Sequence, residues 1–176
     1  EGEAVGSFHP LQALPDSRTG ADRLAGSWIA VTAAEPFAST LDEFAESIGG
    51  RPFRLADADK AVYHAAAVAA GNFTVAALGI AERLLTEAGV PFEAAAPLVA
   101  GIVANAFELG PGAALTGPIA RGDTGTVARQ IEAIADVSDE VLEMFLAMAR
   151  ATALYARAGE AMNEVLRDAY VDDNQR

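Results

Sequence analysis

Cysteine is absent from the 176 residues, and histidine occurs only twice. Without cysteine the chain cannot form disulfides, zinc–thiolate sites or a thiolate nucleophile. No serine stands in a nucleophile-elbow motif, so a serine–histidine–aspartate hydrolase is excluded as well. No metal-ligand spacing occurs either, and we expect no metal site. A cysteine-free chain suits a reducing compartment, so we predict a cytoplasmic protein.

Positive charge is also scarce, with 12 Lys and Arg against 25 Asp and Glu and a net charge of −13. Nucleic acids and anionic membrane surfaces are bound by clustered cations, so we predict neither as a partner. Aromatic residues make up only 7% of the chain. Much of the apolar content is alanine, the strongest helix former, which predicts a mainly helical fold with a core of small side chains.

One stretch, Ala61–Ala81, has no Lys, Arg, Asp or Glu and is long enough to span a bilayer. It also contains His64 and Asn72, polar groups that are unfavourable in lipid. We therefore predict a buried helix of a soluble protein, with a membrane-embedded helix as the alternative. Glu1–Leu14 has neither the basic start nor the apolar run of a secretory signal.

The first third of the chain alternates between strand and helix patterns. Short apolar or β-branched runs predict strands at 4–8, 28–32 and 52–55, and the polar stretch 10–26 predicts a loop. Pro36 begins a helix with a 3.6-residue apolar period that stops at Gly49–Gly50. This order is typical of an α/β sheet, so we assign residues 1–56 to the C-terminal remnant of a Rossmann-like domain.

The rest of the chain has only helical patterns, and we predict a helical domain over 57–170. Asp57 or Asp59 can cap a long helix that runs to about Ala88. Pro97 should kink or split the next helical stretch, 92–109. Further helices are predicted at 124–135, 138–158 and 160–170, with a loop at 110–123 and a frayed tail at 171–176.

No Gly-x-Gly-x-x-Gly sequence follows a strand anywhere in the chain, so the fingerprint of a dinucleotide-binding domain is missing. The few strands also suggest that more of the sheet lies upstream of Glu1. We therefore expect a cofactor-binding part outside this sequence, and no turnover by this chain alone.

Two groups of polar residues are candidates for chemistry in the first half. His9 follows the first strand, and the end of a parallel strand points into the ligand crevice of an open α/β sheet. Lys60 and His64 are four residues apart and share one helix face, with Asn72 two turns further on. A lysine in a partly desolvated cleft can exchange protons near neutral pH. The alternative for His9 is a turn formed by the His9-Pro10 dipeptide. The alternative for the helix is that Lys60 lies in its exposed first turn, with His64 and Asn72 satisfied inside a helix interface.

The second half offers three more polar candidates. Asn105 is a single amide in an apolar helix, where a helix–helix hydrogen bond is the structural alternative. The loop Leu115–Asp123 contains Thr116, a hydroxyl donor, and Arg121, which can bind carboxylate or phosphate. Asp123 or Thr124 would cap the following helix, and an Arg121–Asp123 pair is the structural alternative.

Four segments resemble an uncharacterised bacterial family that joins a Rossmann-like domain to a helical domain of unknown function. They are Ser7–Gln12, Gly50–Phe53, Lys60–Val68 and Leu115–Asp123. More distantly, the layout is similar to ketopantoate reductase, pyrroline-5-carboxylate reductase, prephenate dehydrogenase and 6-phosphogluconate dehydrogenase, whose helical domains dimerise and complete the active site. The resemblance implies a fold like the C-terminal domain of 6-phosphogluconate dehydrogenase, a homodimer, and NADP or NAD as cofactor.

The resemblance also implies roles for individual residues. Lys60 would be the general acid/base and His64 its catalytic neighbour, although His64 stands where ketopantoate reductase has Asn. The remaining candidates would bind substrate: His9, Asn72, Asn105, Thr116 and Arg121. The predicted activity is an NAD(P)-dependent oxidation or reduction of a small hydroxy/keto or amino/imino acid. A non-catalytic helical module for dimerisation or ligand sensing is the alternative.

Overall fold

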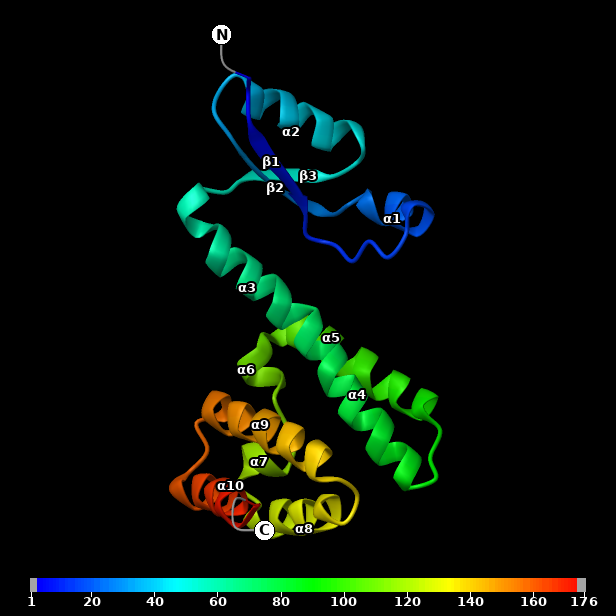
Figure 1. The fold of residues 1–176 in the computed structure, drawn as a ribbon, viewed down its shortest axis with the longest axis vertical. Coiled ribbons are helices and arrows are strands. Elements are labelled where there is room, and N and C mark those ends of the chain that lie inside the picture. Colours follow the sequence, from blue (N-terminus) through cyan, green and yellow to red (C-terminus); the bar gives the residue numbers. More distant parts are fainter. Residues whose placement is uncertain (1–2, 174–176) are drawn as a thin grey trace. The chain divides into compact units, whose positions relative to one another are not determined.

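The computed structural model describes residues 3–173, which form a mainly helical fold with one small sheet (Figure 1). The chain divides into two compact units, Glu1–Thr74 and Val75–Arg176. This division falls later than the predicted boundary at residue 56. The reason is that the first turns of the helix after the sheet still contact the sheet, as the aromatic contact between Phe53 and Tyr63 shows.

The first unit is built around a three-stranded sheet in the order β1-β2-β3. Its elements are β1 (Gly6–Pro10), α1 (Ser17–Leu24), β2 (Trp28–Ala33), α2 (Phe37–Ser47), β3 (Arg51–Arg54), η1 (Asp57–Asp59) and α3 (Lys60–Ala70). β2 and β3 are parallel and joined through α2, which is a βαβ unit. β1 runs antiparallel to β2. The expectation that His9 ends a parallel strand is therefore wrong.

The core of this unit lies between the sheet and α2. Ile29, Val31 and Ala45 are buried there, with Phe8 and Leu41 packed against them. Gly50 lies at the entry to β3, where a Cβ would meet the Ile29 side chain and the Ala45 carbonyl oxygen. The predicted loop at 10–26 contains the helix α1, whose first turn is capped by the Asp16 carboxylate.

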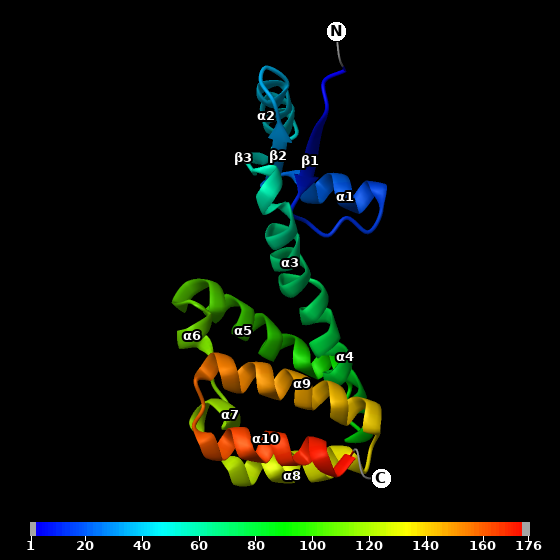
Figure 2. The ribbon, with the colours of Figure 1, turned by 60° about the vertical axis from the view of Figure 1, so that its left-hand side comes forward.

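The second unit contains only helices. They are α4 (Asn72–Glu87, whose first residues belong to the first unit), η2 (Phe92–Ala95), α5 (Ala96–Leu109), α6 (Pro111–Ala114), α7 (Pro118–Arg121), α8 (Thr124–Ala135), α9 (Asp139–Ala156) and α10 (Glu160–Asp173). α7, α8, α9 and α10 lie against one another around a common core (Figure 2). Its fully buried side chains include Val127, Leu146, Met162 and Leu166.

Several helix ends in this unit follow the sequence signals. Asp123 caps α8 by accepting a hydrogen bond from the Thr126 amide, and Ser138 caps α9 through the Val141 amide. Pro97 lies in the first turn of α5, so the stretch is split there, as predicted. The predicted loop at 110–123 contains the one-turn helices α6 and α7. α10 continues to Asp173, beyond its predicted end, and residues 174–176 of the predicted tail lie outside the described residues.

The apolar stretch Ala61–Ala81 forms parts of two helices, because α3 ends at Gly71 and α4 begins at Asn72. The prediction that it is buried is wrong: no residue of α3 is buried, and Ile80 is the one buried residue of α4. Few side chains of the described residues pack against α3 and α4, so the apolar surface of these two helices stays accessible. By length and composition alone, residues 57–87 and 92–109 could each cross a membrane.

Candidate functional site

A small cavity of about 250 Å³ lies in the first unit, between the sheet and the first turns of α3. It brings together three of the predicted site residues, His9, Lys60 and His64. Tyr63, Ser7, Ala30 and Leu55 complete its lining. A concave, mainly apolar site with a few convergent polar groups is the usual form of a small-molecule site.

Strand pleating explains why His9 faces this cavity. Successive side chains of a strand point to opposite faces, so Ser7 and His9 share one face of β1 while Phe8 points to the other. The register places His9 opposite Ala30 on β2, and Ala30 also lines the cavity. Phe8, in contrast, packs in the core against α2. One face of the sheet therefore packs in the core, and the opposite face lines the small cavity.

Helix geometry brings Lys60 and His64 to the same cavity, as their spacing predicts. Lys60 lies in the first turn of α3 and is 39% exposed. Its Nζ atom is 2.8 Å from the Asp57 Oδ1 atom, and this ammonium holds the pKa of the Asp57 carboxyl below its usual value. Asp57 therefore stays ionised and pairs with Lys60 instead of capping the helix.

Tyr63 is the residue of this site that the sequence analysis did not select. Its hydroxyl oxygen lies 3.1 Å from the Nδ1 atom of His9, within hydrogen-bonding distance. The two rings meet edge to face, with centroids 5.5 Å apart. The His64 ring lies 6.1 Å from that of His9, also edge to face. Burial raises the pKa of Tyr63, so the phenol keeps its proton well above neutral pH.

A larger cavity of about 800 Å³ adjoins the small one in the same unit. His9, Tyr63 and His64 line both cavities, and Asn72 lines only the larger one. The rest of its wall comes from residues 10–13, at the end of β1 and just after it, and from α3 with Gly71. Asn72 is exposed, so the apolar helix interface that could have satisfied its amide is not present in the described residues.

The other three candidates lie in the second unit. Asn105 is on α5 and exposed, Thr116 follows α6, and Arg121 is in the last turn of α7. Arg121 and Asp123 form no ion pair within 4 Å in the described structure. The pKa of Asp123 is lowered mainly by its hydrogen bond from Thr126, with a smaller effect of Arg121.

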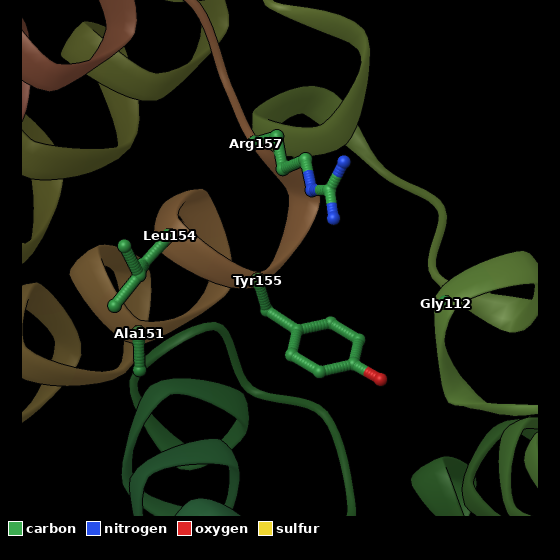
Figure 3. A pocket seen from close by; sticks show the side chains of 5 residues that line it. All are labelled: Gly112, Ala151, Leu154, Tyr155 and Arg157. Atoms are coloured by element: carbon green, nitrogen blue, oxygen red, sulfur yellow. The ribbon is translucent and has the colours of Figure 1, made fainter.

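The second unit also has an open cavity of about 620 Å³ at the end of α9 (Figure 3). It is lined by Gly112, Ala151, Leu154, Tyr155 and Arg157. Figure 3 shows the Tyr155 ring directed toward the segment that carries Gly112. None of the predicted site residues lines this cavity. Among residues 3–173, no three His, Asp or Glu side chains are grouped so that they could hold a metal ion.

Sequence comparison assigns the family. The profile of the family described as "Domain of unknown function (DUF2520)" matches residues 27–152, more than half of the chain. The chain belongs to this family. The matched range includes α3 with Lys60 and His64, and the loop with Thr116 and Arg121. No curated protein sequence matches the chain.

Two solved structures share the fold. One is a Bacteroides fragilis protein provisionally described as an NADP oxidoreductase, with a TM-score of 0.70 and 25% identity over 88% of this chain. The other is a Thermotoga maritima protein, with a TM-score of 0.67 and 24% identity over 86% of the chain. This DUF2520 chain covers 56% and 62% of their lengths, less than two thirds of each. Its fold is therefore that of NADP oxidoreductase-like proteins.

Proposed function

We propose that this chain is the substrate-handling part of an NADP-dependent oxidoreductase that acts on a small carboxylate-bearing hydroxy/keto or amino/imino acid. In this proposal Lys60 is the general acid/base. His64, Asn72 and His9 orient the substrate, and Asn105, Thr116 and Arg121 of the helical unit stay predicted substrate ligands. The description of the Bacteroides relative supports NADP as the cofactor.

The observation that carries this proposal is the convergence of Lys60, His64 and His9 on one small cavity. A volume of about 250 Å³ suits a molecule of a few carbon atoms rather than a polymer. An ammonium next to two imidazoles suits an anionic substrate and offers more than one group able to hold or move a proton at the reacting oxygen or nitrogen.

The cavities of the first unit fit one end of a dinucleotide. The larger one, of about 800 Å³, has room for a nicotinamide with its ribose and adjoins the small cavity. Its lining contains neither a cationic side chain nor a glycine-rich turn to hold the phosphates. Residues 10–13 and Asn72 would therefore contact only the nicotinamide end. When bound, this group would donate or accept the hydride.

Titration of NADPH into the full-length protein tests the proposal. We expect saturable binding with a dissociation constant on the order of micromolar, as is common for cofactor-using enzymes. Calorimetry and the fluorescence of the bound nicotinamide both measure it. A parallel titration with NADH compares the two cofactors, and we expect NADPH to bind more tightly. Absence of saturable binding for both cofactors would overturn the assignment.

We propose further that α5 packs against a second copy of the chain. No α5 residue is buried, and five large apolar side chains on it are exposed: Leu98, Ile102, Val103, Phe107 and Leu109. Glu108 is its one charged residue, so two such surfaces can meet with little repulsion despite the net charge of −13. Asn105 and Glu108 are unfavourable in lipid, which favours a protein partner over a membrane. A cytoplasmic location stays a prediction.

Phe107→Glu is expected to weaken the dimer of the full-length protein by about 10–100-fold, because it places a carboxylate in an apolar contact on both copies. Phe107 is 90% exposed, so the variant should still fold. Analytical ultracentrifugation at several concentrations measures the change, and Leu14→Glu, an exposed site of the first unit, is the control. A variant as dimeric as wild type would contradict this interface, as would detergent-dependent solubility of the wild type.

A further inference from the structure

Tyr63 occupies the wall that the two cavities of the first unit share. Together with His9 and His64 it lines both of them. It is half-buried, and its ring meets that of Phe53 on β3 at a centroid distance of 5.9 Å. Its backbone is held in α3 and its ring by the sheet, so its hydroxyl has a fixed place beside His9.

Few contacts, in contrast, restrain the side chain of His9. It is exposed on β1, which among the described residues pairs only with β2. The hydrogen bond between its Nδ1 atom and the Tyr63 hydroxyl is the one that the described structure gives its side chain. An exposed imidazole without this bond would sample several rotamers and both neutral tautomers.

We propose that Tyr63 is a positioning residue that orients His9 and sets its tautomer, so that the His9 Nε2–H group hydrogen-bonds the reacting oxygen of the substrate. This inference rests on the proposed function, because it gives His9 a task in the same small cavity. Lys60 remains the group that transfers the proton. The His9 Nε2–H group donates a hydrogen bond that polarises a carbonyl or stabilises an alkoxide.

In this proposal the Tyr63 hydroxyl is the donor of the hydrogen bond and the His9 Nδ1 atom is its acceptor. Burial raises the pKa of Tyr63, so its hydroxyl is protonated at neutral pH and can donate to the Nδ1 atom. A neutral imidazole that accepts at Nδ1 carries its proton on Nε2. The donor nitrogen is then the one that Tyr63 leaves available to a bound substrate.

Nuclear magnetic resonance of ¹⁵N-labelled histidine determines the tautomer of each ring directly, without knowledge of the substrate. In the full-length protein with ¹⁵N-labelled histidine, His9→Gln and His64→Gln variants assign the signals of the two rings. We expect wild-type His9 to be in the Nε2–H form, with an Nδ1 signal shifted by an accepted hydrogen bond. Tyr63→Phe keeps the aromatic ring and removes the hydroxyl, so the Nδ1 signal should move to its unbonded position.

Turnover provides the second measurement. With NADPH and a panel of small 2-keto acids, Tyr63→Phe is expected to lower kcat about tenfold, the effect of one lost hydrogen bond. Tyr155→Phe is the matched control, since Tyr155 is an exposed tyrosine of the second unit. It should leave both kcat and the His9 signals unchanged.

The outcomes separate this inference from the proposed function. A His9 signal that is the same in wild type and Tyr63→Phe overturns the positioning role, even when NADPH binds and turnover is seen. An unchanged kcat in Tyr63→Phe overturns it as well. Absence of NADPH binding, together with a shifted His9 signal, overturns the proposed function and supports the contact between Tyr63 and His9.

Discussion

Leu146→Ala is expected to lower the free energy of unfolding by about 3 kcal/mol, within the range of 2–5 kcal/mol for such core truncations. Leu146 lies on α9, is 1% exposed, and belongs to the core that α9 forms with its neighbouring helices. Most buried side chains of that core are Ile, Val, Leu or Met, so truncation of Leu146 leaves a cavity among large apolar neighbours. Urea unfolding followed by circular dichroism measures the change.

The same helix offers a matched control. Leu154 is also on α9 but is 80% exposed, so Leu154→Ala removes the same atoms from water-accessible surface. We expect it to change the free energy of unfolding by no more than about 0.5 kcal/mol. Equal losses for the two variants would contradict the placement of the core, because they would mean that a second copy or another part of the protein covers Leu154 equally well.

The sequence predicts a helix well where a cap and an apolar period agree. α8 spans Thr124–Ala135 as predicted, because the Asp123 carboxylate closes its first turn and its apolar residues face α9 and α10. α1 was missed because its eight residues have no apolar stripe, although the Asp16 cap was present as a signal. The break at Gly71 was missed because a single glycine within a helical pattern is often tolerated.

The candidate site was predictable only in part, because some of its residues are brought together by contacts between distant parts of the chain. The four-residue spacing of Lys60 and His64 indicates a shared face, and both line the small cavity. His9 is brought to them by pairing in the sheet, which local sequence does not specify, and its strand proved antiparallel. Tyr63 was overlooked because its importance comes from its contact with His9, 54 residues away in the chain.

Burial was the least predictable property. A long apolar run such as Ala61–Ala81 indicates a helix whose apolar surface packs against something, but the run does not identify the packing partner. In the described residues α3 and α5 have no buried residue at all. Their apolar surface is therefore the reason to expect a second copy, and their polar residues are accessible to a ligand rather than satisfied by a core.

Lys60→Met is expected to lower turnover of the full-length protein by about 10²–10⁴-fold, the range attributed to general acid–base catalysis. Methionine keeps the length of the side chain and removes the ammonium that lies in the small cavity beside His64 and His9. NADPH binding and the thermal unfolding midpoint should change little, because the Lys60–Asp57 pair is solvent-exposed. Oxidation of NADPH with the panel of 2-keto acids measures turnover.

Arg83→Met separates loss of a catalytic ammonium from loss of an ordinary surface ion pair. Arg83 pairs with Glu140 at 2.8 Å, the same distance as in the Lys60–Asp57 pair, and its side chain is 47% exposed against 39% for Lys60. It lies in the second unit and lines none of the cavities described above, so its variant should keep full turnover. If Lys60→Met instead keeps turnover but loses the dimer or unfolds at a lower temperature, Lys60 has a structural role and the non-catalytic alternative is the better account of the helical half.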